Sequence, residues 1–186
     1  MTLIFLLNKV VFDMNVKKIT FLGLMLALIL VLSMLENMLP PFFPMLPPQF
    51  SRIGLSNVIV MYLVFFMGKK EAVTMAVLKA LFGLLMRGLM AGLLSLAGGL
   101  LSIFFIILLL WIFRGKVSYI ALSIAGAIAH NLGQLTVASL ILENWNLFVF
   151  YFPILLISGV IFGSITGTFL KIIMPVFDRM HKGGNL

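Results

Sequence analysis

Long apolar runs separated by short polar breaks make up most of this chain. Each run is close to the ~20 residues that a helix needs to cross a bilayer core. The runs lack the alternation of apolar and polar residues that a membrane β-strand needs over ~10-residue segments. The pattern predicts an all-α integral membrane protein with six transmembrane helices, at residues 18–38, 53–68, 71–86, 93–113, 118–142 and 148–170.

The composition supports this interpretation. Of the 186 residues, 63% are hydrophobic and only 10% are charged, and the mean hydropathy is +1.25, so the chain is far more apolar than a soluble domain. There is no cysteine, which excludes disulfides and thiolate sites. We expect one transmembrane domain over residues 18–170, preceded by a short segment (1–17) and followed by a tail (171–186).

The distribution of lysine and arginine predicts the orientation. A cytoplasmic N-terminus places ten of them on the inner side, where positive residues are favoured. These ten are Lys9, Lys17, Lys18, Lys69, Lys70, Arg114, Lys116, Lys171, Arg179 and Lys182. Arg52 and Arg87 lie outside, and Lys79 lies within a span. We therefore expect both termini to be cytoplasmic, and the net charge of +8 to reflect topology rather than nucleic-acid binding.

Polar side chains within the expected spans fall at similar depths. At 1.5 Å per residue from the inner ends, Lys79 lies about 12 Å deep, Asn57 about 17 Å, and His130, Asn131 and Gln134 about 18–24 Å. The last three share one helix face, because they are spaced by three and four residues. Polar groups in membranes usually face the bundle interior or a wet cavity. We expect a substrate-binding site formed by Asn57, Lys79, Arg87, His130, Asn131 and Gln134.

Structural explanations remain open for these residues. The long side chain of Lys79 could reach an interface instead of a cavity. The polar side chains of the fifth span could join helices by hydrogen bonds without binding any ligand. At the outer rim, Glu36 is the single anion beside Arg52, Arg87 and Lys79. This balance favours an anionic or partly anionic solute.

The segment 39–52 joins the first two spans on the outer side and holds five of the seven prolines. Proline removes a backbone donor and restricts the preceding residue, so a regular helix is excluded here. The segment could cover the site as an extracellular lid, with Glu36, Phe42, Phe43 and Arg52 as rim and gate residues. The alternative is an aromatic belt at the lipid headgroups.

Small residues recur at four-residue intervals in three spans. Such spacing allows close backbone approach between membrane helices. In the last span the series predicts a packing face formed by Gly159, Gly163 and Gly167. Similar series in the fifth and first spans are Ala121, Ala125, Ala129 and Gly133, and Gly23, Ala27 and Val31.

Motifs for catalysis are missing from the sequence. No GxxxxGK[ST] occurs, so the chain has no P-loop for ATP hydrolysis. Asp13 and Asp178 are the only aspartates, too few for paired carboxylates that bind magnesium for diphosphate chemistry. There are two histidines, and one of them is in the C-terminal tail, which argues against a zinc site. We expect no enzymatic activity, no cofactor and no metal site.

Three stretches carry a resemblance to a known family. They are SRIGLSN (51–57), SLAGGLLS (95–102) and AGAIAHNLGQL (125–135). Together they resemble the bacterial Gx transporter family, often labelled heptaprenyl diphosphate synthase component I. That family is similar to the S components of energy-coupling factor (ECF) transporters. The resemblance extends from about Lys17 to Lys171.

The resemblance implies a six-helix S-component-like bundle in a bacterial cell membrane that captures a vitamin-like micronutrient from outside. It implies a transmembrane coupling subunit and two cytoplasmic ATPase subunits as partners. The coupling-subunit interface would lie on the first helix at Gly23, Ala27 and Val31, with glycine in place of the usual first alanine.

Two other functions remain open. The prenyl-synthase label suggests a noncatalytic membrane subunit of a prenyl diphosphate synthase or redox system. A self-contained channel or carrier is a third hypothesis.

Overall fold

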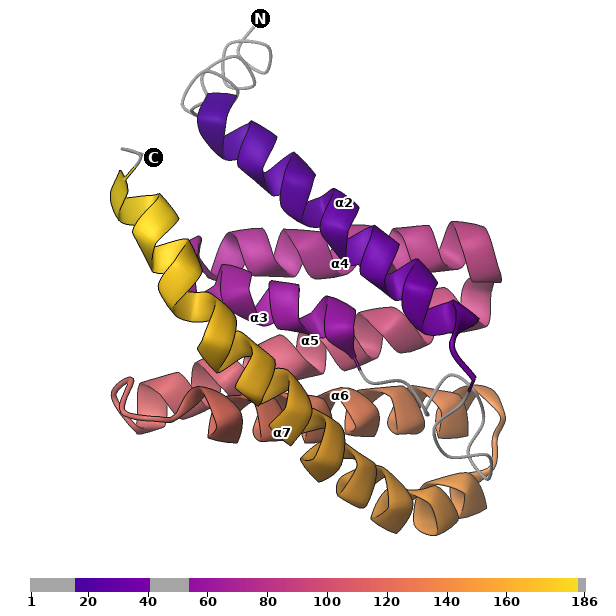
Figure 1. The fold of residues 1–186 in the computed structure, drawn as a ribbon. Helices are drawn as coiled ribbons and strands as arrows, with labels where there is room; N and C mark the ends of the chain where they lie inside the picture. The colour runs from indigo at the N-terminus through magenta and orange to yellow at the C-terminus, as the bar shows by residue number, and fades with distance from the viewer. Residues whose placement is uncertain (1–15, 41–53, 184–186) are drawn as a thin grey trace, which may run out of the picture.

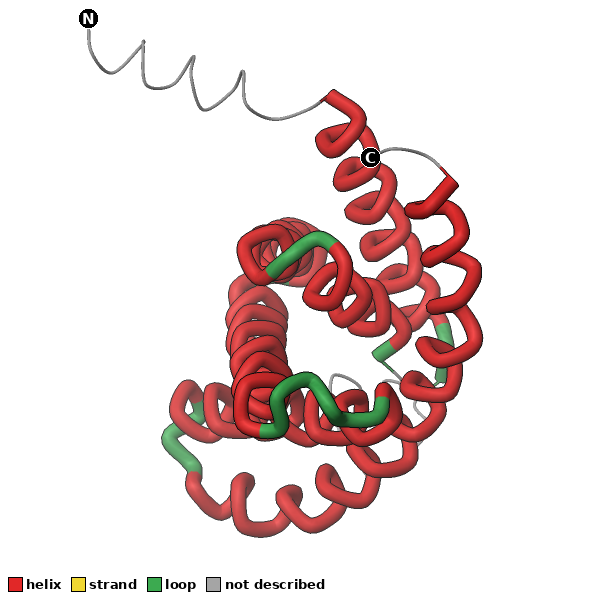
Figure 2. The backbone as a smooth tube through the Cα atoms, turned by 90° about the vertical axis from the view of Figure 1, so that its left-hand side faces the viewer, coloured by secondary structure: helices red, strands yellow, loops and turns green. Residues whose placement is uncertain are grey.

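The structure, a computed structural model, describes residues 16–40 and 54–183. Within these residues the chain forms helices and no strand, which confirms the all-α prediction. The helices are α2 (Val16–Met38), α3 (Leu55–Phe66), α4 (Lys69–Arg87), α5 (Leu89–Ile112), α6 (Tyr119–Ile141) and α7 (Trp145–Gly183). Helices α3 to α6 run roughly alongside one another, and α2 and α7 cross them obliquely on one side (Figures 1 and 2).

The helix boundaries differ from the expected spans in three places. Helix α3 has only 12 residues, because Gly54 before it and Gly68 after it have positive φ angles of 81° and 119°. Helix α5 begins at Leu89, directly after Gly88, rather than at residue 93. Helix α7 has 39 residues and continues into the segment expected to be a tail. Burial explains this extension, since Leu170 and Met174 still pack in the core.

Four helical segments in the described part of the chain are long and apolar enough to cross a membrane. They are Lys18–Met38, Leu89–Ile112, Tyr119–Ile141 and Trp145–Pro175. Helix α3 is shorter, and its 12 residues span about 18 Å against a hydrocarbon core of about 30 Å. Helix α4 is long enough but carries Lys79 and charged residues at both ends. Four long apolar helices are consistent with a multi-pass membrane protein, and the count of six spans stays a prediction.

The core is built around α3. This helix contacts α2, α4, α5 and α7, and eight of its 12 residues are buried. Leu63 of α3 is fully enclosed, as are Ile29 of α2, Ile106 of α5 and Leu122 of α6. A helix that is surrounded by protein on most sides need not match the thickness of the lipid, which accounts for its shortness.

The two ends of the bundle differ in their connections and charge. The start of α2, the end of α7 and the α3–α4 and α5–α6 turns lie at one end (Figure 1). We call it the inner end, after the expected orientation, and the opposite end the outer end. The inner end carries most of the described cations, in the way that the positive-inside rule requires. Among these residues are Lys18, Lys69, Lys70, Arg114 and Lys116.

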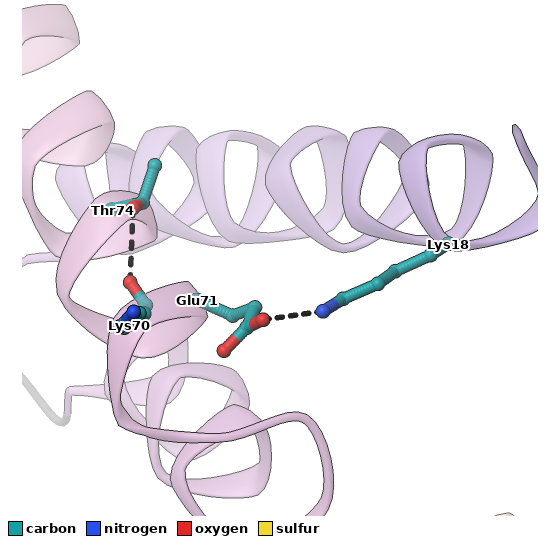
Figure 3. Close-up of polar contacts among 4 residues, drawn as sticks. All are labelled: Lys18, Lys70, Glu71 and Thr74. Atoms are coloured by element: carbon teal, nitrogen blue, oxygen red, sulfur yellow. Dashed lines mark hydrogen bonds and ion pairs between the residues drawn. The ribbon is translucent and has the colours of Figure 1, made fainter. Parts of the chain in front are cut away.

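An ion pair joins α2 to α4 at the inner end (Figure 3). Nζ of Lys18 lies 2.5 Å from Oε1 of Glu71, which is in the first turn of α4. A carboxylate in this position also interacts favourably with the N-terminus of its own helix. On the next turn, Thr74 donates to the carbonyl of Lys70 at 2.9 Å.

Glycines bring α6 and α7 into backbone contact. A Cβ atom added at Gly163 would lie 2.6 Å from Cα of Ile124, and one at Gly167 would lie 2.7 Å from Cα of Ile120. Gly159 lies in the same way against Ile128. The three isoleucines are spaced by four residues, like the glycines, so the two series face each other along the helices.

The series on α2 has a different environment. Nothing lies within 4 Å of a Cβ atom added at Gly23, and Ala27 and Val31 are exposed. This face of α2 is not covered by the described part of the chain.

The substitution Gly163→Ala should destabilise the protein, because the added methyl group collides with the backbone of α6. Overpacking of this kind costs about 1–3 kcal/mol. The same substitution at Gly23 should have little effect, because the space there is open. Thermal unfolding of both variants in detergent measures the difference. Equal loss of stability would contradict the close α6–α7 packing.

Candidate functional site

A cavity of about 310 Å³ lies toward the outer end of the bundle and is lined by every helix. It contains all six residues that the sequence predicts for the substrate-binding site. These are Asn57, Lys79, Arg87, His130, Asn131 and Gln134. The remaining lining residues include Glu36, three serines and several apolar side chains. The structure therefore brings together polar residues from α2, α3, α4, α5 and α6.

Glu36 is not the exposed rim charge that the sequence suggests. Its side chain is only 8% exposed and holds the first turn of α3. Oε1 accepts a hydrogen bond from the backbone nitrogen of Leu55, and Oε2 accepts one from Oγ of Ser56 at 3.2 Å. A helix start leaves such donors unsatisfied, and Gly54 provides no side chain to cap them. Glu36 supplies this cap from another helix.

Three other predicted residues of the rim and gate lie outside the described residues: Phe42, Phe43 and Arg52. The chain enters this segment from the end of α2 and leaves it at Gly54, which lines the cavity.

Lys79 and Asn57 form a pair that joins α4 to α3. Nζ of Lys79 donates to Oδ1 of Asn57 over 2.6 Å. Lys79 lines the cavity and is partly buried, so its side chain does not extend to a lipid interface. An ammonium group can only donate, which orients the amide of Asn57 with its oxygen toward the lysine.

Arg87 lies at the outer end of α4 and links it to α2. Nη1 donates to Oδ1 of Asn37 at 3.0 Å. The guanidinium folds back along its own helix, since a Cβ atom added at Gly83 would lie 3.2 Å from Nη2. The glycine therefore leaves room for the arginine beside the cavity.

The three polar residues of α6 combine both expected roles. Asn131 lines the cavity and also joins α6 to α7, because Nδ2 donates to the carbonyl of Leu155 at 3.0 Å and to Oγ of Ser158 at 3.2 Å. Gln134 and His130 contact each other through their Nε2 atoms, 3.0 Å apart. Helix packing and cavity lining are thus not exclusive alternatives here.

Gly98 of α5 makes room for the histidine. A Cβ atom added there would lie 2.8 Å from both Cε1 and Nδ1 of His130 and 2.9 Å from Cγ of Gln134. One turn away, Gly133 of α6 lies against the carbonyl of Ala97. The described part of the first stretch (54–57) and the stretches 95–102 and 125–135 all contribute residues to the lining of this cavity.

Sequence reasoning missed the hydroxyl groups of the site. Ser33, Ser56 and Ser95 line the cavity from α2, α3 and α5. A weak signal was present, because Ser33 and Glu36 are three residues apart and share a helix face. The apolar lining, including Leu94 and Phe162, carried no signal that distinguishes it from ordinary core.

The substitution Gly98→Ala should displace the imidazole of His130. The chain has only two histidines, so a spectrum of histidine-labelled protein resolves this ring easily. We expect a changed His130 resonance and a loss of stability of about 1–3 kcal/mol from overpacking. Gly99→Ala is the matched control, because its Cβ would make an ordinary 3.5 Å contact with Ala76. An unchanged His130 signal in Gly98→Ala would contradict this geometry.

A comparison with known proteins identifies the family. Residues 25–173 match the family described as heptaprenyl diphosphate synthase component I, which covers most of the chain and all the described lining of the cavity. Neither a curated protein nor a solved structure is significantly similar to the chain. On the extent of this match, the chain belongs to the heptaprenyl diphosphate synthase component I family.

Proposed function

We propose that this protein is the substrate-binding membrane subunit, or S component, of an ECF-type transporter. It captures a vitamin-like, anionic small molecule from outside a bacterial cell for ATP-driven uptake. The observation that carries the proposal is the cavity toward the outer end, which holds Lys79, Arg87 and the amides of α3 and α6. Its volume of about 310 Å³ is within the range of small-molecule sites.

The charges around the cavity favour an anion. Lys79 and Arg87 contribute two positive charges against the one carboxylate in the described lining, Glu36, so the balance is positive. Positive charge in a cleft with apolar walls raises the local concentration of anions. Hydrogen bonds within the protein hold these polar groups in place.

The need for partners follows from what the chain lacks and from what it exposes. Its sequence contains no P-loop, so ATP hydrolysis must come from the two ATPase subunits. The face of α2 with Gly23, Ala27 and Val31 is uncovered and offers a packing surface for the transmembrane coupling subunit. Small residues on such a face permit close helix approach.

The family description favours one other function, a noncatalytic membrane subunit of a prenyl diphosphate synthase. Co-purification with a synthase, and loss of synthase activity when the protein is deleted, would support this function over transport.

Native purification followed by mass spectrometry tests the transport proposal. We expect a bound small molecule to co-purify and to be lost in Lys79→Ala and Arg87→Ala, because both remove a cation from the cavity. Lys70→Ala is the control, since Lys70 is exposed at the inner end. An empty protein, together with no uptake beside a coupling module and its ATPases, would count against the proposal.

The coupling surface has its own test. Ala27→Leu places a larger side chain on the uncovered face of α2 and should abolish uptake while leaving ligand binding intact. Ala121→Leu makes the same change on an exposed position of α6 and should leave uptake unchanged. Normal uptake by Ala27→Leu would assign the coupling surface elsewhere.

A further inference from the structure

The hydrogen bonds around the cavity divide it into a donor side and an acceptor side. On the α3–α4 side, Lys79 orients the amide of Asn57 by donating a hydrogen bond to its Oδ1 atom. The Nδ2 group is what this amide can offer to a ligand. Lys79 and Arg87 carry only donors as well. This side therefore presents hydrogens and positive charge, which suit an acceptor or an anion.

The α6 side presents the opposite chemistry. Both hydrogens of the Asn131 amide are directed to α7, to the carbonyl of Leu155 and to Oγ of Ser158. The carbonyl of Leu155 can only accept, and the hydroxyl of Ser158 donates to that same oxygen at 3.0 Å. Both partners therefore accept from Asn131. These partners leave Oδ1 as the group that Asn131 can offer to a ligand.

Gln134 strengthens this acceptor side. Its Nε2 lies 3.0 Å from Nε2 of His130. Nε2 of Gln134 can only donate, so Nε2 of His130 accepts and the imidazole carries its proton on Nδ1. The carbonyl oxygen of Gln134 then remains for the cavity, which this residue lines. Two amide oxygens on one helix suit a ligand with N–H or O–H donors, because a ligand that covered them without donating would leave them unpaired.

Apolar side chains also line the cavity. Leu94 and Phe162 are almost fully buried, and Met90, Ala91 and Ala127 are further members of this apolar lining. Glu36 accepts from Leu55 and Ser56 and its charge offsets one of the two cations, so the described lining still carries more positive than negative charge. A ligand that meets both sides is therefore bipolar, with unlike polar groups on an apolar body.

We infer that the cavity selects a compact molecule with an anionic group that faces Asn57, Lys79 and Arg87, an apolar body of ring size, and an N–H or O–H donor that faces Asn131 and Gln134. Amino- or hydroxy-substituted aromatic acids are the simplest members of this class. The inference rests on the proposed function in taking this cavity as the ligand site, and it specifies the chemistry that function leaves open.

Three probes of one scaffold test the inference: 4-aminobenzoate, benzoate and aniline. Their affinities are measured on the full-length protein in lipid nanodiscs by calorimetry or saturation-transfer NMR. We expect 4-aminobenzoate to bind about tenfold more tightly than benzoate, because only the first satisfies the α6 oxygens. Benzoate should bind more tightly than aniline. Equal affinity for the two acids, tightest binding of aniline, or no binding of any probe would overturn the inference.

Single substitutions separate the two sides. Asn57→Asp replaces the amide donor beside Lys79 with a carboxylate oxygen. The affinity for both acids should fall by about tenfold or more, while the affinity for aniline should not fall. Asn144→Asp is the matched control, because Asn144 lies in the α6–α7 turn and does not line the cavity. If both variants weaken the acids equally, the donor side is wrongly assigned.

Gln134→Leu removes an acceptor and should reduce the preference for 4-aminobenzoate over benzoate. Gln134→Glu keeps the acceptor oxygens and should retain that preference, which separates ligand recognition from a loss of folding. Preference retained in a folded Gln134→Leu protein, or lost in a folded Gln134→Glu protein, would overturn the role of the α6 side.

This proposal can fail separately from the transport proposal. A co-purified and transported ligand without a donor group would overturn the bipolar site and leave transport intact. The expected probe ranking without uptake beside any coupling module would support the bipolar site and count against transport.

Discussion

The contact between Glu36 and the start of α3 sets the position of the candidate site. It supplies the cap that Gly54 cannot supply, and it fastens the end of α2 to the most enclosed helix of the bundle. Asn57 lies in that same first turn and accepts a hydrogen bond from Lys79 of α4. Because buried polar groups are costly when unpaired, each of these contacts depends on the others being in place. A carboxylate that looks like a rim charge is thus the support for the donor side of the cavity.

The cavity illustrates how a membrane protein can hold many polar groups in an apolar bundle. Several of these groups form hydrogen bonds that join neighbouring helices. Arg87 of α4 donates to Asn37 of α2, and Asn131 of α6 donates to Leu155 and Ser158 of α7. Each pair fixes the direction of an amide or a guanidinium, and the atoms left over define what a ligand must provide. Helix packing and ligand recognition are therefore functions of the same side chains.

Much of the fold could be predicted from the sequence, because apolar runs and glycine breaks report directly on helix length. The depth of Asn57, Lys79 and His130 also predicted that they share one site. The role of Glu36 could not be predicted, since it depends on how α2 lies across α3. The length of α7 was missed for a related reason. Lys171 marks a polar break, but the packing of Met174 in the core extends the helix beyond it.

Polar contacts attach helix α2 to its neighbours at both of its ends, through Lys18 to α4 at one end and through Glu36 to α3 and Asn37 to α4 at the other. Lys18 and Glu36 are 18 positions apart, which corresponds to about 27 Å along a helix and so to nearly the full hydrocarbon thickness. These are specific polar contacts, so they oppose a shift of the helix along its axis. The vertical register of α2 is consequently set by the protein itself rather than by the lipid, even though one face of the helix is uncovered.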